Sequence, residues 1–482
     1  MVTSLLQDNQ ERKVYEWLPF RFDRLRSGGV VVTNMLGEWL KLSDSEFNDL
    51  AGKVFSKPEL LIKLTSKHII RIKNDKLPVR LLALKIATKN KNLSYATGLH
   101  IFVVTLRCEH ACEYCQVSRQ NSRNTEFDMA ESDAYAALAI AFMSPSQNIK
   151  LEFQGGESLL NFDLIKKIVI RAQEMNIRFK KNLAFVIATN LAVIDDEILS
   201  FAKTHNIFFS TSLDGPSSLH NANRSRPGKN SWELAISGIE RVRKELGHDQ
   251  VSALMTTTDR SLTMPKEIID EYVRMGFQEI FLRHLSPYGH AVKSGANLKY
   301  NNRRWLNFYF EGLEYIIELN RNGTEIVEIL ASTYLKKMLT NSSGGYVDLA
   351  TPTGAGLGAL VYNYDGDIYA SDEGRMLKEM GDETFKLGSV RTHTFSDVLL
   401  SDSLLNAVEE SFAPSNPMCS DCAFESHCGS DPVIHHATQG DFVGFKPSST
   451  FCERTTEIVP FLMEKYETDR FCRDLFTRWS VR

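Results

Sequence analysis

Ile101-Phe-Val-Val-Thr-Leu-Arg-Cys108-Glu-His-Ala-Cys112-Glu-Tyr-Cys115 joins an apolar, strand-like run to three closely spaced cysteines, and it decides the fold. The spacing C-x3-C-x2-C lets three thiolates hold three irons of a [4Fe–4S] cluster, which leaves the fourth iron open to a small molecule. A closed zinc site would need a fourth ligand, and the nearby His110 is awkwardly spaced for that role. We therefore expect a metal site on the loop that follows this strand.

A second strand-like run, residues 148–153, ends in Gln154-Gly155-Gly156-Glu157. Two glycines let a ligand approach the backbone closely, and the carboxylate can pair with an ammonium group. The cysteine triplet after one strand and Gly-Gly-Glu after the next resemble the radical S-adenosylmethionine (SAM) superfamily. The resemblance implies that Cys108, Cys112 and Cys115 bind the cluster. It also implies that Gly155, Gly156 and Glu157 receive the methionine amino group of SAM.

Length and composition narrow the class of protein. A chain of 482 residues predicts two or three domains, and its 43% hydrophobic and 24% charged content is ordinary for a globular protein. The net charge of −4 does not indicate binding to nucleic acid or to an anionic membrane. No apolar run has the length of a membrane span. We expect a cytoplasmic protein whose eight cysteines serve metal or cluster ligation rather than disulfides.

Residues 100–290 alternate between strand and helix patterns. The expected strands are 101–106, 149–153, 184–189, 207–213, 251–257 and 279–283. The expected helices are 129–142, 162–176, 195–205, 231–246 and 265–275. This pattern predicts an α/β fold, a partial (β/α)6 barrel of the TIM type over residues 96–295, with function at the C-terminal ends of its strands.

Ser212-Leu-Asp-Gly-Pro216, followed by His220 and Arg224, resembles a stretch of the peptide-modifying radical SAM enzymes. That resemblance implies that Ser212 hydrogen-bonds SAM and that a nearby arginine pairs with the SAM carboxylate. Arg224 and Arg226 are both eligible, and we favour Arg224. Asn190, at the end of the third strand, is a candidate for the ribose, and Tyr114 of the triplet is a further cofactor-binding candidate. Polar residues at strand ends are also common turn formers.

Residues 296–482 carry a second cysteine group, Cys419, Cys422, Cys428 and Cys452. Four thiolates suit either zinc or a [4Fe–4S] cluster. The segment resembles the SPASM (or twitch) extension of radical SAM peptide maturases, whose full pattern has seven cysteines for two auxiliary clusters. The three cysteines of one cluster are replaced here by Thr353, Asp372 and Pro432. The resemblance therefore implies one auxiliary [4Fe–4S] cluster, with Asp372 as a possible ligand or a catalytic acid–base group.

Residues 1–95 read as a winged-helix-like module. Residues 29–33 and 38–42 form a hairpin pattern, Ser43–Glu46 is a helix capping box, and a further helix is expected at about 79–89. No helix carries the basic stripe of a DNA-recognition helix. The module resembles the leader-peptide recognition element of ribosomal-peptide maturases, which takes the leader as an extra strand. The expected free edge is Val30–Thr33 or Glu38–Leu42.

Residues 432–444 and 363–373, together with the hairpin, look like the His-Xaa-Ser system radical SAM maturases (HxsB type). The resemblance implies a precursor peptide with a leader and a His-Xaa-Ser core, a second radical SAM maturase and an external electron donor. It implies an oxidoreductase that crosslinks an imidazole to an sp³ carbon through a 5′-deoxyadenosyl radical. Two alternatives stay open: an epimerase or other isobaric modification, and a zinc-stapled scaffold without catalysis. An epimerase usually needs a thiol hydrogen donor, and the isolated Cys472 lies at the chain end.

Overall fold

The computed structural model describes residues 14–55, 57–293, 300–340, 342 and 346–482. Its central sheet has eight strands in the order β12-β11-β10-β9-β6-β15-β16-β17. The first five expected barrel strands are parallel neighbours in this sheet. They are β6 (Leu99–Thr105), β9 (Asn148–Gly155), β10 (Asn182–Ala188), β11 (Ile207–Ser212) and β12 (Val251–Leu254).

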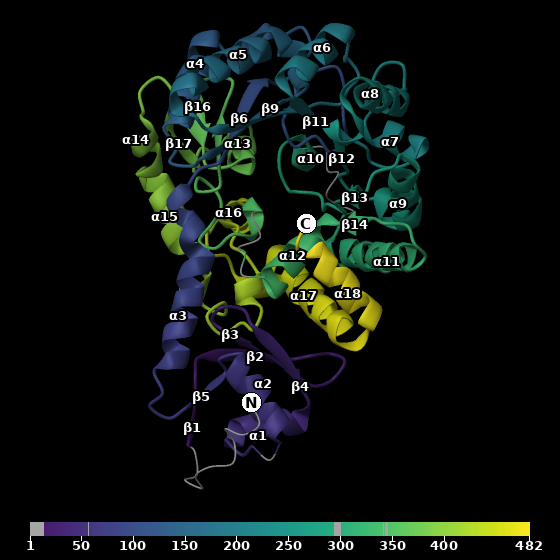
Figure 1. Ribbon diagram of the computed structural model, residues 1–482. Coiled ribbons are helices and arrows are strands. Elements are labelled where there is room, and N and C mark those ends of the chain that lie inside the picture. Colours follow the sequence, from purple (N-terminus) through teal and green to yellow (C-terminus); the bar gives the residue numbers. More distant parts are fainter. Residues whose placement is uncertain (1–13, 56, 294–299, 341, 343–345) are drawn as a thin grey trace.

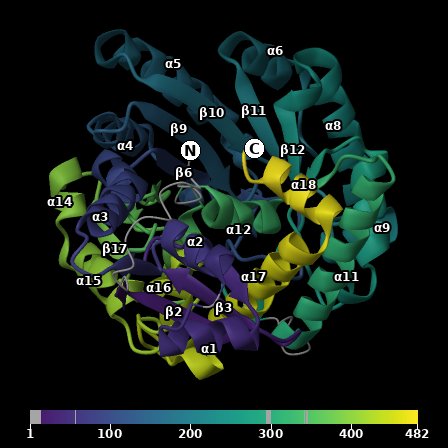
Figure 2. The same ribbon diagram turned by 60° about the horizontal axis from the view of Figure 1, so that its bottom comes forward.

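Helices cover the outer side of the curved sheet, as Figure 2 shows. They are α4 (Glu131–Phe142), α5 (Phe162–Phe179), α6 (Asp196–His205), α7 (Ser217–Asn223), α8 (Ser231–Leu246) and α9 (Pro265–Arg274). Each longer helix has one apolar face, such as Ile165, Ile168 and Val169 of α5, which is fully buried against the strands. The predicted α/β fold with a partial parallel barrel is confirmed.

The sixth expected strand is shorter than the sequence suggests. β13 (Glu279–Ile280) pairs in parallel with β14 (Val327–Glu328) in a sheet of its own, and α11 (Asn302–Arg321) lies between them in the chain. α11 packs on α9, so a strand–helix–strand unit continues beyond residue 295. The proposed division of the chain at residue 295 therefore runs through this unit.

The C-terminal region also joins the barrel. β15 (Ala359–Tyr362) pairs in parallel with β6, in a register that sets Leu99 beside Ala359. β16 (Asp367–Tyr369) and β17 (Lys386–Ser389) follow in antiparallel order, and α13 (Asp372–Lys378) begins just after β16. The remaining helices are α10 (His290–Lys293), α12 (Ile329–Leu339), α14 (Phe395–Leu399), α15 (Asp402–Glu410), α16 (Pro432–Gln439), α17 (Thr450–Thr468) and α18 (Arg470–Trp479). No described helix is long and apolar enough to cross a membrane.

The N-terminal module is a three-stranded sheet with helices on one face. Its strands are β2 (Phe20–Arg24), β3 (Val30–Asn34) and β4 (Trp39–Leu42), beside a ribbon of β1 (Tyr15–Trp17) and β5 (Ile70–Ile72). Its helices are α1 (Asp44–Gly52), α2 (Pro58–Ser66) and α3 (Leu77–Asn90), and Ser43 forms the expected capping box with Glu46. The hairpin is present, but β3 lies between β2 and β4. The expectation that Val30–Thr33 is a free edge is therefore wrong, because β2 occupies that side.

The module packs directly on the C-terminal region, below the barrel in Figure 1. Arg21 of β2 forms a buried ion pair with Glu425 (2.6 Å), and its Nε donates to the carbonyl of Ser420 at 2.6 Å. Lys89 of α3 donates to the carbonyl of Ser426 at 3.3 Å. The N-terminal module thus holds the loop that carries Cys419, Cys422 and Cys428.

Candidate active site and cysteine clusters

The cysteine triplet opens onto a cavity of about 250 Å³ at the C-terminal ends of the barrel strands. Cys108 ends β7 (Arg107–Cys108), which follows β6 and pairs with β8 (Gln120–Asn121). Cys108, Cys112 and Cys115 all line the cavity and none forms a disulfide. Six of the seven proposed cofactor-binding residues line it too: Tyr114, Gly155, Gly156, Asn190, Ser212 and Arg224.

Gly155 and Gly156 are needed for a reason that sequence reasoning did not supply. Gly155 has φ +154°, and a Cβ there would lie 1.9 Å from the carbonyl oxygen of Thr105. A Cβ on Gly156 would lie 2.5 Å from the carbonyl oxygens of Leu106 and Arg107. The two glycines let the end of β9 pack against the backbone that leads into the cysteine loop, as well as leaving space at the cavity.

Glu157 lies differently from the expectation. Its side chain is fully buried and accepts hydrogen bonds from Thr189 Oγ1 (2.7 Å), Asn190 N (2.8 Å) and Leu159 N (3.0 Å). Burial, with the nearby Glu109 carboxylate, raises the pKa of Glu157 to about 7. Glu157 therefore fixes the end of β10 and is not among the residues that line the cavity.

Asp214 anchors two proposed cofactor-binding side chains. It is fully buried and accepts from Arg224 Nε and Nη2 at 3.1 Å each, and from Tyr114 OH at 2.8 Å. A bidentate pair of this kind fixes the guanidinium in one orientation. Arg224 thus already has a carboxylate partner, and Tyr114 is held beside it. Asp214 stands in the quoted Ser-Leu-Asp-Gly-Pro stretch at a strand end, which is the signal that could have marked it.

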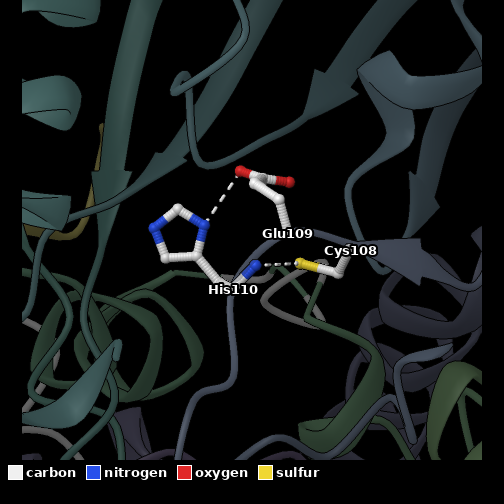
Figure 3. Close-up of side chains that lie close together, drawn as sticks. All are labelled: Cys108, Glu109 and His110. Atoms are coloured by element: carbon white, nitrogen blue, oxygen red, sulfur yellow. Dashed lines mark hydrogen bonds and ion pairs between the residues drawn. The ribbon is translucent and has the colours of Figure 1, made fainter. Parts of the chain in front are cut away.

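Glu109 and His110 link the cysteine loop to the end of β10. His110 Nδ1 lies 2.9 Å from Glu109 Oε1 (Figure 3). Asn190 Nδ2 donates to the same oxygen at 2.8 Å. Cys108, Glu109 and His110 place one potential metal-ligand atom each within 4.8 Å of one another. Since Glu109 Oε1 and His110 Nδ1 already satisfy each other and Asn190, these two side chains orient the loop.

Two carboxylates also line the cavity. Asp372, at the start of α13, accepts from the buried Arg375 Nη2 at 2.8 Å and faces the same cavity as Glu152 of β9. Glu152 accepts from Gln154 Nε2 at 2.7 Å, and burial raises its pKa. Sequence reasoning missed Glu152, although it alternates with Gln154 on one face of a strand. Asp372 lines this cavity and is not among the residues that line the four-cysteine cavity described below.

Buried carboxylates stand next to two of the three cysteine replacements in the chain. Glu373 and Asp431, next to Asp372 and Pro432, line a small cavity of about 40 Å³ together with Asp348. Burial raises the pKa of Glu373 and of Asp431 to about 7 and that of Asp348 to about 6.

Cys419, Cys422, Cys428 and Cys452 line a separate cavity of about 160 Å³. Burial raises the pKa of Cys422 to about 12 and that of Cys452 to about 11, so the free thiols are protonated there. The buried ammonium of Lys337 donates to the carbonyl of Cys428, which places a cation beside the group. Bound metal would supply the further positive charge that four thiolates require.

A comparison with known protein families covers the segment that carries these strands and the cysteine triplet. Residues 102–278 match the family model of the radical SAM superfamily. The likeness to this family is shown for that segment. It includes the cysteine triplet and the strand ends that form the cavity.

Two curated relatives indicate how far the likeness extends. The chain is 28% identical over 190 residues to an uncharacterised protein of Methanocaldococcus jannaschii, which covers 39% of this chain and 62% of that protein. It is 23% identical over 358 residues to a serine-type anaerobic sulfatase-maturating enzyme of Bacteroides thetaiotaomicron, covering 70% and 83%. The chain therefore spans less than two thirds of the length of the first of these relatives.

Solved structures share the fold beyond the radical SAM domain. The protein anSMEcpe with bound AdoMet superposes with a TM-score of 0.64 at 15% identity, covering 79% of this chain and 99% of that one. SuiB of Streptococcus suis, bound to its precursor peptide SuiA, superposes with a TM-score of 0.53 at 14% identity, covering 91% and 100%. At these identities the likeness is one of fold.

The radical SAM domain implies a [4Fe–4S] cluster and SAM, and the cysteine positions fit the cluster. Sulfurs around a tetrahedral zinc ion lie about 3.8 Å apart, since each Zn–S bond is about 2.3 Å. No three cysteine sulfurs of the described chain all lie within 4.8 Å of one another. The three thiols that line the reaction cavity suit a four-iron cluster held by three cysteines.

Proposed function

We propose that this chain is a radical SAM enzyme that modifies a ribosomally made precursor peptide by oxidative crosslinking of side chains at His-Xaa-Ser motifs. The observation that carries the proposal is the pair of cysteine sites in one chain. Three cysteines open onto the reaction cavity, and four line a separate cavity in the C-terminal region. The first site suits SAM cleavage, and the second suits acceptance of the further electron that a crosslink releases.

When bound, the cluster and SAM supply a 5′-deoxyadenosyl radical. The chain's own residues position the reactants. Asn190 and Ser212 offer polar groups at two strand ends, while Asp214 fixes Arg224 and Tyr114 on the cavity wall. We assign Asp372 as the base that takes the proton lost on oxidation, because it faces the cavity and Arg375 orients it.

An epimerase is the second candidate, and the residues that line the reaction cavity do not favour it. An epimerase needs a hydrogen donor on the far side of its substrate, usually a thiol. Among the described residues, only the triplet contributes cysteines to the reaction cavity. Cys472 is buried on α18 and bonds to Asp469, so it does not supply that donor.

We further propose that the module of residues 1–95 binds the leader of the precursor along β4. SuiB was solved with its precursor peptide, and its fold likeness to 91% of this chain supports a peptide partner here. β4 is an outer strand of its sheet, with β3 on its other side. A second radical SAM maturase and an external electron donor complete the proposed partners. The eight unpaired cysteines support a cytoplasmic location.

Anaerobic purification tests the cofactors, and mass spectrometry tests the reaction. A brown protein with about eight irons per chain is expected, whereas colourless protein with stoichiometric zinc would point to the scaffold alternative. Coexpression with a His-Xaa-Ser precursor should give a peptide lighter by two hydrogens. A product that takes up one carbon-bound deuteron from deuterated solvent, with no other change of mass, would identify an epimerase instead.

A matched pair of variants separates the two cysteine sites. Cys419→Ser should lower the iron content to about four per chain and stop crosslinking while SAM cleavage continues. Cys472→Ser should change neither, because that thiol bonds only within α18 and its cap. Loss of iron in Cys472→Ser would contradict the assignment of ligands.

A further inference from the structure

We propose that a small cavity beside the reaction cavity binds a second imidazole of the precursor peptide. The cavity has a volume of about 40 Å³, and we call it the carboxylate cavity after three side chains that line it, Asp348, Glu373 and Asp431. The inference rests on the proposed function, because it takes the substrate to be a peptide with His-Xaa-Ser motifs. It assigns a specificity site for the histidine next to the one that reacts, and no bond is made or broken there.

Arg283 and the start of α13 join the carboxylate cavity to the reaction cavity. The side chain of Arg283 lines both. Asp372 and Glu373 follow one another at the start of α13, where Asp372 lines the reaction cavity and Glu373 lines the carboxylate cavity. Histidines of contiguous His-Xaa-Ser motifs lie three residues apart, which is about 10 Å in an extended chain. We therefore expect one peptide to place an imidazole in each cavity.

The carboxylate cavity has more acidic than basic groups. Besides its three carboxylates it has two guanidiniums, those of Arg283 and Arg454. The ion pair recorded among these five described side chains joins Arg283 to Glu373 at 3.9 Å, and Arg454 donates instead to Asn302 Oδ1 at 3.3 Å. His284 also lines the cavity, and burial lowers its pKa well below the ordinary range, so it is neutral. A bound cation would balance the excess of carboxylates.

Tyr288 is a second, independent sign of a ligand. It is 1% exposed and lines the cavity, and its hydroxyl has no hydrogen-bond partner in the described part of the chain. Buried polar groups are normally satisfied by protein, water or a ligand, because an unpaired one is unfavourable. An imidazole has two ring nitrogens, so it can bond to this phenol and to a carboxylate at once.

The size and the walls of the cavity suit a flat ring. One water needs about 10–15 Å³ of such volume, so the cavity has room for about three waters or for one imidazole ring. Phe281, Tyr346 and Phe451 form part of the wall, and the rings of Phe281 and Tyr346 meet edge to face at 5.9 Å. Aromatic walls attract a flat cationic ring, whereas a lysine ammonium is a compact and strongly hydrated charge.

Peptide binding to the full chain tests the site by a double-mutant cycle. The probe is a fluorescent peptide of two contiguous His-Ala-Ser motifs without a leader, and two further peptides carry phenylalanine in place of one or the other histidine. Glu373→Gln should weaken binding of the two-histidine peptide by about tenfold, as expected for loss of a charge-assisted hydrogen bond. For one of the phenylalanine peptides, Glu373→Gln should have no effect. Glu383→Gln, at an exposed carboxylate outside both cavities, is the matched control.

Equal weakening of all three peptides by Glu373→Gln, or weakening of none, would overturn the site. A peptide with arginine in place of the second histidine tests the occupant. Binding of this peptide as tight as that of the two-histidine peptide would overturn the assignment to imidazole.

Tyr288→Phe separates a ligand-binding role from a structural one. It should weaken the two-histidine peptide by about fivefold, yet it should not lower the melting temperature of the free protein, because the hydroxyl has no partner there. Tyr315→Phe, which loses a hydrogen bond to Asp270 outside both cavities, is the control and should bind the peptide normally. A lower melting temperature with unchanged peptide affinity in Tyr288→Phe would overturn the inference.

Mass spectrometry of the full precursor separates this inference from the proposed function. A product lighter by two hydrogens, together with a failed double-mutant cycle, would overturn the carboxylate cavity as a binding site and leave the proposed function standing. Absence of that product with the unmodified chain would overturn the proposed function.

Discussion

Asp214 holds two side chains of the reaction cavity with one carboxylate. Replacing it leaves the buried Arg224 without an anionic partner, and Tyr114 loses its acceptor at the same time. Breaking one side of a buried ion pair typically costs about 3–5 kcal/mol. The residue therefore couples the stability of the barrel to the shape of the proposed SAM site.

Asp214→Asn is expected to lower both the free energy of unfolding and the affinity for SAM. The matched control is Asp196→Asn, whose exposed pair with Arg241 should contribute only about 0–1 kcal/mol. Chemical denaturation measures the first quantity and equilibrium dialysis with labelled SAM the second. If Asp214→Asn were as stable and bound SAM as tightly as the control, the anchoring role would be wrong.

Asp372→Asn is expected to reduce crosslinked product by about 100-fold or more, in the range that loss of a general base produces. SAM cleavage should continue, because Asp372 is not one of the proposed cluster-binding or SAM-binding residues. Asp382→Asn, whose carboxylate pairs with His436 outside the cavity, is the control. Product yield and 5′-deoxyadenosine are measured in the same reactions, and equal loss of both would place Asp372 in SAM binding.

At this scale, most of the proposed site residues could be predicted because they follow parallel strands, whose C-terminal ends converge in a barrel. The roles of single side chains could not be predicted from the sequence. Glu157 is turned into the protein by three hydrogen-bond donors, and the partner of Arg224 is Asp214 from its own loop. Which partner a side chain binds depends on how close two chain segments lie in space, and the sequence pattern does not give that distance.

At the scale of elements, β4 is the strand on which leader recognition can be tested. Asn34 N donates to the carbonyl of Glu38 at 3.0 Å, so pairs 32/40 and 30/42 are the hydrogen-bonded pairs of this ladder. The N–H groups of Trp39 and Lys41 therefore point away from β3, and that of Leu40 points toward it. A test at Leu40 would damage the sheet itself.

Lys41→Pro should weaken binding of a His-Xaa-Ser precursor by about fivefold, as expected for the loss of one hydrogen bond of ~1 kcal/mol. Lys41→Ala keeps the N–H and should bind normally. Fluorescence anisotropy of a labelled precursor measures both, with SAM cleavage as the check on folding. Unchanged affinity in Lys41→Pro would move the leader to another edge, such as the outer side of β2.

The bounds of helices and strands show which elements the sequence pattern could predict. The amphipathic pattern of α8 predicted Ser231–Leu246 without error, because a long helix repeats its signal over several turns. The short strand β2 escaped notice although Phe20-Arg-Phe-Asp-Arg alternates, and its pairing makes β3 central. Short strands carry little periodicity, so their partners must be seen in three dimensions.

At the scale of the whole molecule, the N-terminal module is a support for the four-cysteine site. The ion pair of Arg21 with Glu425 is buried on both sides, and a Cβ on Gly37 would lie 3.0 Å from the side chains of Ser426 and His427. Deletion of residues 1–95 would therefore expose the cysteine loop as well as remove the proposed leader site. A deletion alone cannot separate the two roles.

Arg21→Ala is expected to destabilise the chain by about 3–5 kcal/mol and to lower its iron content, because Glu425 stays buried without a partner. Arg24→Ala, which breaks the exposed pair with Asp44, should cost about 0–1 kcal/mol and leave iron unchanged. Thermal unfolding and iron analysis of the full chain measure the effects. Full iron content and stability in Arg21→Ala would show that the module is not needed for the cysteine site.

The pairing of β6 with β15 also determines when, during translation, the strand before the cysteine loop can gain both of its neighbours. The strand that leads into the cysteine loop has β9 on one side, but its other neighbour, Ala359–Tyr362, leaves the ribosome much later. At roughly 5–20 residues per second, that interval lasts from about ten seconds to a minute. During this time the strand before the cysteine loop has only one of its two neighbours, so we expect metal insertion after Ala359–Tyr362 has been made. Nascent chains that stall before β15 and β16 should therefore contain no iron–sulfur cluster and should be colourless.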